Sequence, residues 1–193
     1  MIRKTASANL PTKFGVFRMS VYKSSKGLEH VALVRGQVQN PMLARIHSSC
    51  VTGDIFSSLK CDCGEQLAQS MEEIQKNGSG VILYLNQEGR GIGLTNKIKA
   101  YALQEKGFDT IEANELLGLP VDARDYQVAA EILRDLQITK IYLLTNNPDK
   151  ENQLIKNGIE IVKRMRIEVV PNEVNRSYLR TKKDKLAHLL SYV

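Results

Sequence analysis

Hydrophobic and polar residues alternate in the first third of the chain in a manner typical of β-strands. Three segments mix β-branched or aromatic residues with polar ones, and Gly, Pro or Asn lies near their ends: residues 13–22, 30–36 and 41–47. Such short runs between turn-forming residues predict strands. We therefore expect the amino-terminal third to be rich in strands.

After residue 64 the apolar residues recur at helical spacing. Leu67, Met71 and Ile74 follow one another every three or four residues, and Gly78 then gives a stop signal, so a helix is predicted. Short apolar runs alternate with further helical patterns beyond this point. The predicted strands are 80–85 and 159–170, and residues 140–147 are predicted to form a strand followed by a turn. The further predicted helices are 97–106, 125–136, 151–157 and 179–190.

This order of elements predicts an α/β fold: a mixed sheet in a layered arrangement, with functional loops at the strand ends. The chain has no internal repeat, low-complexity segment or Pro/Ser-rich linker. Its 193 residues suffice for one domain with a proper core. We therefore predict a single domain over residues 1–193.

Charge and composition narrow the class of partner. The net charge of +6 suits an anionic partner, either nucleic acid or a phosphorylated small molecule. Basic residues are scattered apart from 180–185, and there is no Trp, which argues against a nucleic-acid surface because such surfaces interleave basic and aromatic residues. No apolar run approaches the roughly 20 residues of a membrane helix, and the basic start lacks a signal peptide's apolar segment. We expect a cytoplasmic protein without membrane association.

The three cysteines form one short cluster, Cys50, Cys61 and Cys63. An odd, clustered set favours a metal or reactive thiols over a disulfide framework. Three protein ligands, with a fourth position left for water, are typical of catalytic zinc. Two alternatives remain open: buried thiols without a metal, and a structural zinc site with His47 as the fourth ligand.

A glycine-rich stretch, residues 87–94, joins a predicted strand to a predicted helix. Its backbone N–H groups and Arg90 are suited to binding a phosphate, although the spacing matches neither common phosphate-loop motif. Arg45, Arg124 and Lys150 are further phosphate-binding candidates. From their spacing alone, Asp122 and Arg124 are interpreted as a surface ion pair ahead of a helix.

Together these stretches resemble the GTP cyclohydrolase II family, and the resemblance covers nearly the whole chain in order. The cysteine spacing, the glycine-rich stretch and the TNNP turn recur together, which makes the resemblance specific. The matching motifs are LPTKFG, LARIHSSCVTGDIFSSLKCDCGEQL, LYLNQEGRGIGLTNKIKAYALQEKGFDTIEAN, LPVDARDYQVAAEIL, YLLTNNPDK and YLRTKKDKLAHLL.

The resemblance implies a hydrolase that performs the first step of riboflavin synthesis. Such enzymes take GTP and water, release C8 of the guanine as formate, release pyrophosphate, and leave 2,5-diamino-6-(5-phosphoribosylamino)pyrimidin-4-one. One zinc ion per chain, held by the three cysteines, activates the water that attacks C8. A homodimer is implied as well, and Mg²⁺ is compatible with the triphosphate.

The resemblance also implies individual roles. Asp122 is the proton acceptor, Tyr101 assists ring opening, and Arg124 is assigned as nucleophile at the α-phosphate. Because arginine stays protonated, a phosphate clamp is the easier role for Arg124. The implied GTP-binding residues are Arg45, Ile46, His47, Ser48, Ser49, Gln66, Glu88, Gly89, Arg90, Thr110, Thr145 and Lys150.

The chain departs from the family pattern at two positions. Ser49 stands where Glu is expected beside the first cysteine, and Ala123 replaces a Glu between Asp122 and Arg124. The first change leaves open a relative with incomplete or absent turnover. Two other classes stay as alternatives: a nucleotide- or nucleic-acid-binding module with structural zinc, and a zinc deaminase. The deaminase lacks support because neither of its motifs, H-x-E and P-C-x-x-C, occurs here.

Overall fold

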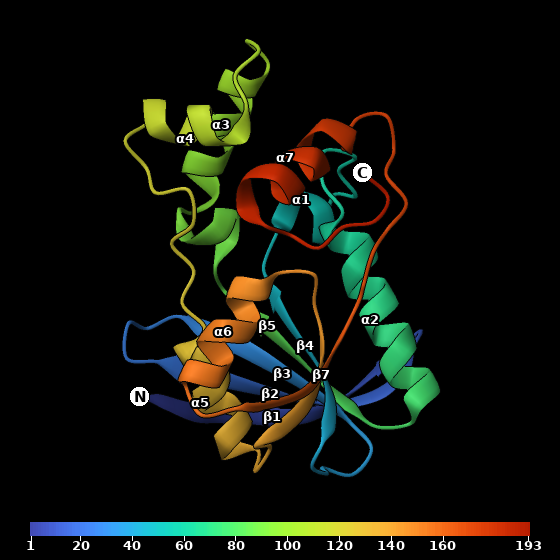
Figure 1. Ribbon diagram of the computed structural model, residues 1–193. Coiled ribbons are helices and arrows are strands. Elements are labelled where there is room, and N and C mark those ends of the chain that lie inside the picture. The colour runs from blue at the N-terminus through green and yellow to red at the C-terminus, as the bar shows by residue number, and fades with distance from the viewer. The chain divides into compact units, whose positions relative to one another are not determined.

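The computed structural model describes residues 1–193 and contains one mixed sheet of seven strands (Figure 1). The β1–β2, β2–β3 and β3–β5 pairs are antiparallel, whereas β4–β6 and β6–β7 are parallel. The prediction of a mixed α/β sheet is therefore confirmed. In sheet order the strands are β1 (Ile2–Thr12), β2 (Gly15–Ser24), β3 (Glu29–Arg35), β5 (Gly80–Leu85), β4 (Met42–Ser48), β6 (Lys140–Leu144) and β7 (Glu160–Met165).

Seven α-helices and one short 3₁₀ helix, η1, accompany the sheet. None of these helices is long and apolar enough to cross a membrane. Their bounds are α1 (Val51–Asp54), α2 (Cys63–Asn77), η1 (Glu88–Gly91), α3 (Leu94–Gln104), α4 (Thr110–Leu116), α5 (Gln127–Asp135), α6 (Pro148–Lys156) and α7 (Arg176–Leu186).

The chain divides into two compact units by its internal contacts. The sheet unit comprises residues 1–47, 66–86 and 125–167, and the cysteine unit comprises residues 48–65, 87–124 and 168–193. The predicted single domain over 1–193 stays a prediction.

Alternation along the central strands gives the sheet unit its layers. Val81 and Leu83 of β5 pack into a cluster with α5 and α6, while Ile82 packs into a second cluster with Ile74 of α2. Because successive side chains on a strand point to opposite faces, the two clusters lie on opposite faces of the sheet. Figure 1 shows α2 apart from α5 and α6 accordingly. The predicted layered arrangement follows from buried strands that carry apolar residues on both faces.

The periodic segments formed the predicted elements, with boundaries that shifted. The last helix ends at Leu186, because Ala187 adopts the left-handed conformation (φ 52°), so the predicted extension to 190 is wrong. β7 likewise ends at Met165, ahead of the predicted 170. Four elements were not predicted: β1, α1, η1 and α4.

Candidate functional site

The three thiols of the cysteine unit lie at the ends of short elements. Cys50 is the N-cap of α1, Cys61 lies in the loop before α2, and Cys63 is the first residue of α2. Their sulfur atoms all lie within 4.8 Å of one another, and the Cys50 and Cys61 sulfurs are 3.7 Å apart. The structure therefore brings the three predicted ligands together.

The spacing of these sulfurs fits a tetrahedral zinc ion. Zinc–thiolate bonds of about 2.3 Å at tetrahedral angles separate two sulfurs by about 3.8 Å. The group contains three thiols and no imidazole or carboxylate. This donor count matches a catalytic site with an open position rather than a closed structural site.

Two glycines make this close packing of the thiols feasible. A Cβ on Gly53 would lie 2.8 Å from Cys61 Sγ and 3.4 Å from Cys50 Sγ. A Cβ on Gly64 would lie 2.3 Å from the carbonyl oxygen of Gly53, which no real side chain tolerates. The first turn of α2 and the α1 segment can therefore approach each other only with glycine at both positions. The sequence prediction did not single out either glycine.

The pKa values of the thiols are shifted in different directions by their surroundings. Hydrogen bonds from Cys61 and Cys63 lower the pKa of Cys50, and contacts with Thr52 and Lys97 act in the same direction, against the effect of burial. The contacts with Cys50 and Cys61, together with burial, raise the pKa of Cys63. The contacts with Thr52 and Lys97 therefore favour the thiolate form of Cys50.

Carboxylates and a lysine fix the two cysteine-bearing loops. The backbone N–H of Cys50 donates to Asp54 Oδ2 at 2.9 Å. Asp62, between the other two thiols, accepts from Lys182 Nζ of α7 at 2.7 Å, and both side chains are buried. Lys182 also lies 4.6 Å from the Tyr178 ring centroid. The carboxy-terminal helix thus belongs to the structure that supports the thiols, a role the sequence prediction missed.

The glycine-rich stretch forms η1 in an unusual backbone conformation. Gly89 and Arg90 both adopt φ 61°, in the left-handed region, and Arg90 Nη1 is buried without a hydrogen-bond partner. Ser49 Oγ accepts from the backbone N–H of Gln87 at 3.1 Å, and Ser48 Oγ donates to Gln87 Oε1 at 3.4 Å. Ser48 and Ser49 therefore hold the start of the predicted phosphate-binding stretch.

Asp122 and Arg124 form a two-pronged ion pair. Arg124 Nε donates to both Asp122 oxygens, at 2.9 and 3.1 Å, its Nη2 donates to Oδ2, and its backbone N–H donates to Oδ1 at 3.0 Å. Burial alone would raise the pKa of Asp122, but the hydrogen bonds and charge of Arg124 outweigh burial and lower it. Asp122 is consequently ionised at neutral pH. Asp125 accepts from the Gln127 N–H at 2.8 Å, one residue ahead of the N-cap Tyr126 of α5.

Tyr101 lies on α3, half-buried near two cations. Lys60 Nζ is 4.8 Å and Lys97 Nζ 5.8 Å from its ring centroid. Burial raises the pKa of Tyr101 to about 12, so its phenol keeps its proton at neutral pH. Thr110 is the first residue of α4, where Asp109 and Glu112 form a capping box.

In the sheet unit, two buried basic side chains, Arg45 of β4 and Lys150 of α6, contact backbone carbonyls in the carboxyl-terminal halves of β6 and β4. Arg45 donates to the carbonyl of Leu144 at 3.0 Å and to Gln66 Oε1 at 2.7 Å. Lys150 donates to the carbonyl of Ile46 at 2.6 Å. Because β4 and β6 are parallel, their carboxyl ends share one edge of the sheet, where ligands commonly bind.

The TNNP turn follows β6 at the same edge. Thr145 Oγ1 accepts from the N–H of Asn147, and the Asn147 side chain in turn accepts from Asp149 as the N-cap of α6. The segment is therefore a capping turn ahead of α6. His47 stacks on Tyr84 with ring centroids 5.5 Å apart. The structure thus groups Arg45, Gln66, Thr145 and Lys150 around the ends of two neighbouring strands.

The fold and the site define a mixed-sheet α/β protein with a three-thiol centre suited to a metal ion and a glycine-rich stretch in the same unit. The profile of the family described as GTP cyclohydrolase II matches residues 3–166. The chain belongs to the GTP cyclohydrolase II family.

Two kinds of relative match the chain along its length. "GTP cyclohydrolase-2" of Neisseria meningitidis is 53% identical over 193 residues, which are 99% of this chain and 98% of that protein. "Riboflavin biosynthesis protein RibBA" of Phocaeicola vulgatus is 50% identical over 100% of this chain, and that of Aquifex aeolicus is 52% identical over 98%. The chain spans 48% of the length of either RibBA relative.

Proposed function

We propose that this chain hydrolyses GTP in the first step of riboflavin synthesis. The guanine imidazole ring opens, C8 leaves as formate, and pyrophosphate is released to give 2,5-diamino-6-(5-phosphoribosylamino)pyrimidin-4-one. The observation that carries the proposal is the trio of thiols at zinc spacing in a chain of this family. The name of the Neisseria relative, GTP cyclohydrolase-2, supports the same substrate. A cytoplasmic homodimer is part of the proposal.

Cys50, Cys61 and Cys63 would hold one zinc ion. Zinc so held supplies a Lewis acid that makes a water nucleophilic enough to attack C8. Mg²⁺ would assist through the triphosphate, because phosphate oxygens are hard ligands of the kind it prefers.

Asp122 would accept the proton, and Arg124 would bind the phosphate that is being released. In the structure two guanidinium N–H groups and the backbone N–H of Arg124 donate to Asp122. Because an arginine side chain stays protonated, this geometry favours a clamp over a nucleophile. A substrate phosphate that takes over this fork would remove the hydrogen bonds that lower the pKa of Asp122. Substrate binding would thereby make Asp122 a stronger base.

Tyr101 would assist ring opening as a hydrogen-bond donor, because its phenol stays protonated at neutral pH. The GTP contacts of the proposal come from the family resemblance. They are Arg45, Ile46, His47, Gln66, Thr145 and Lys150 of the sheet unit, and Ser48, Ser49, Glu88, Gly89, Arg90 and Thr110 of the cysteine unit.

A second candidate function is nucleotide binding with incomplete turnover, and Ser49 favours it. The expected Glu would place a carboxylate next to Cys50, whereas the Ser49 hydroxyl accepts a hydrogen bond from Gln87 instead. Loss of that carboxylate removes one group able to orient a water or a cation.

Product identification by mass separates the two functions. Zinc-loaded protein incubated with GTP should release formate and pyrophosphate in equal amounts and yield the diaminopyrimidine. Pyrophosphate without formate would favour incomplete turnover. Neither product, with zinc fully loaded, would overturn the proposed hydrolysis.

A further inference from the structure

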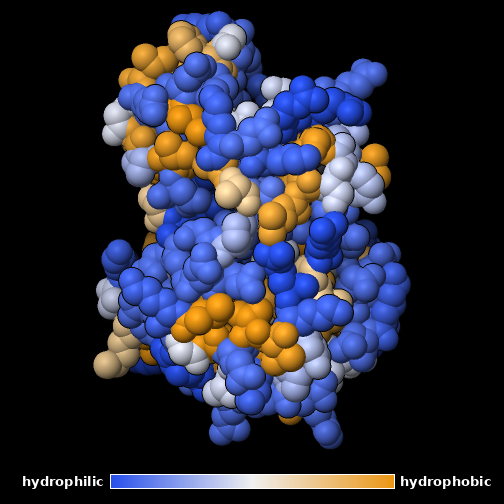
Figure 2. Space-filling model, in the orientation of Figure 1, coloured by the Kyte–Doolittle hydropathy of each residue, from blue (hydrophilic) through white to orange (hydrophobic).

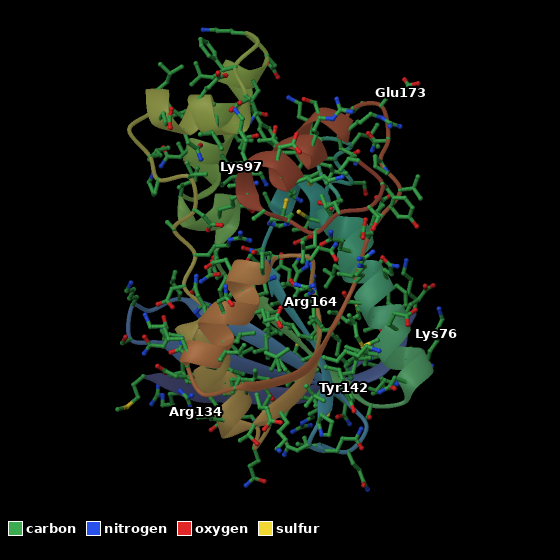
Figure 3. All side chains as sticks on the ribbon, in the orientation of Figure 1. Lys76, Lys97, Arg134, Tyr142, Arg164 and Glu173 are labelled. Atoms are coloured by element: carbon green, nitrogen blue, oxygen red, sulfur yellow. The ribbon has the colours of Figure 1, made fainter.

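Lys97 is a buried cation that touches a thiol of the metal centre. It lies on α3, is labelled in Figure 3, and is 8% exposed. Its Nζ donates to Cys50 Sγ at 3.0 Å and to Glu88 Oε1 at 2.8 Å. None of the family roles considered above involves Lys97, whose sequence context is that of an ordinary helix.

A cation at this position would offset the negative charge of a metal centre with three thiolate ligands. Three thiolates around a divalent ion leave a net charge of −1, and an unpaired buried charge is costly. A hydrogen bond to a ligating thiolate also draws electron density from the sulfur, so the sulfur donates less to the metal. Lys97 would supply both effects at Cys50.

Glu88 holds Lys97 in place. Its Oε1 accepts from Lys97 and from the N–H of Gly89 at 2.9 Å, and its Oε2 accepts from the N–H of Val51 at 2.6 Å. Val51 follows Cys50 directly, and Gly89 belongs to the glycine-rich stretch. One carboxylate therefore ties the lysine, the first ligand loop and η1 together.

We propose that Lys97 is a positioning residue of the metal centre: its ammonium offsets the charge of the three thiolates and orients Cys50, and Glu88 fixes it there. Glu88 then acts on the metal centre through these three contacts. This inference rests on the metal centre of the proposed function and extends it to the residues that tune the metal.

Zinc affinity and a ligand-field spectrum test the proposal without reference to turnover. Lys97→Met should weaken zinc binding, measured by competition with a chelator, by about 10- to 100-fold, as loss of outer-shell partners typically does. In the Co²⁺-substituted protein its thiolate charge-transfer band should move to longer wavelength, because the sulfur loses a hydrogen bond. Lys97→Arg should restore most of the affinity.

Lys99→Met is the matched control, because Lys99 lies on the same helix and is exposed. It should leave affinity and spectrum unchanged. If Lys97→Met does not fold, Lys97→Gln keeps an N–H donor without the charge and should still weaken zinc binding, by a smaller factor. Wild-type affinity and an unshifted band in Lys97→Met, or wild-type affinity in a folded Lys97→Gln, would overturn the proposal.

The same experiments separate this inference from the proposed function. Wild-type protein that binds no zinc would overturn both. Wild-type protein that binds zinc but releases neither product would overturn GTP hydrolysis alone, and weakened metal binding in Lys97→Met would still support the role of Lys97.

Discussion

The two units of the chain are built on different interiors. Both buried apolar clusters lie in the sheet unit, where side chains such as Ile82, Leu83 and Ile132 are fully buried. The cysteine unit buries few apolar side chains, such as Leu179, and also buries Asp62, Lys97 and two of its thiols. Figure 2 shows apolar side chains on its surface around α3 and α4, and the exposed ones there are Leu94, Ile98, Phe108 and Leu116.

This difference separates two sources of stability. Burial of apolar area contributes roughly 25 cal/mol per Å² and does not depend on a ligand, so the sheet unit stabilises itself. Metal ligation contributes folding free energy only when the metal is bound. We therefore infer that the order of the cysteine unit would depend on a metal ion bound by its thiols, while the order of the sheet unit would not.

The largest expected effect comes from removal of a ligand. Cys61→Ala should reduce bound zinc from about one ion per chain to nearly none, because a two-thiolate site lacks the ligand count for tight binding. Formate release should be lost, while pyrophosphate release, a separate reaction, should persist at a reduced rate. Metal analysis and product assays measure these effects. Lys26→Ala, in an exposed turn of the sheet unit, is the control, and a zinc-replete Cys61→Ala protein would contradict the site.

Loss of the proton acceptor should leave the metal in place. Asp122→Asn should lower kcat for formate release by about 100- to 10,000-fold, the usual range for a general base, with zinc content unchanged. Asp125→Asn, which keeps a side chain able to cap α5, is the matched control. Turnover within a few fold of wild type in Asp122→Asn would remove Asp122 from the mechanism.

The ion pair of Asp122 and Arg124 gives a pH prediction of defined sign. Arg124 lowers the pKa of Asp122, so Asp122 loses its charge only when the pH falls through this lowered pKa. In Arg124→Ala the effect of burial is opposed only by the backbone N–H at position 124 and by the charge of Arg90. The pKa of Asp122, followed by the NMR shift of its carboxyl carbon, should therefore rise above the wild-type value. An unchanged or lower pKa would show that Arg124 does not control this group.

A smaller effect is expected from crowding of the ligand loops. Gly64→Ala places a methyl group against the Gly53 carbonyl and should cost about 1–3 kcal/mol, as overpacking does. Because the contact lies beside the thiols, zinc affinity should fall together with the melting temperature. Gly118→Ala meets nothing within 4 Å and costs only the strain of φ 65°, so its zinc affinity should stay at the wild-type level. Equal zinc affinities in the two variants would contradict the packing account.

The smallest effect belongs to the sheet unit. Tyr22→Phe removes a hydrogen bond from the phenol to Asp135 of 2.7 Å, which is worth about 1 kcal/mol. The melting temperature should fall by about 2–4 °C for a chain of this size, with zinc affinity unchanged. A change in zinc affinity would show that the two interiors are not independent.

The sheet unit was the more predictable of the two. The apolar periodicity of the sequence predicted α2 and α5, because the buried faces of these helices carry the core residues Ile74 and Ile132. β1 was not predicted. Its side chains are mostly exposed and polar, as is possible for a strand at the edge of a sheet. In the cysteine unit, α4 was not predicted because it is short, although the capping pair Asp109 and Glu112 indicates the start of a helix.

In the cysteine unit the spacing of the thiols indicated a metal, but the supporting residues could not be identified from the sequence. Lys97 lies in an ordinary helical pattern, and its contact with Cys50 joins residues 47 positions apart. Asp62 and Lys182 are 120 positions apart. Such pairs depend on the folded arrangement rather than on local pattern, so only the structure assigns them.

Hydrogen–deuterium exchange with and without zinc tests the dependence of the cysteine unit on its metal most directly. Removal of zinc by a chelator should increase the exchange rates of the amides of α3 and α7, while the amides of β3, β5 and α5 stay protected from exchange. Exchange that is unchanged in α3 and α7, or that rises equally in both units, would contradict the account.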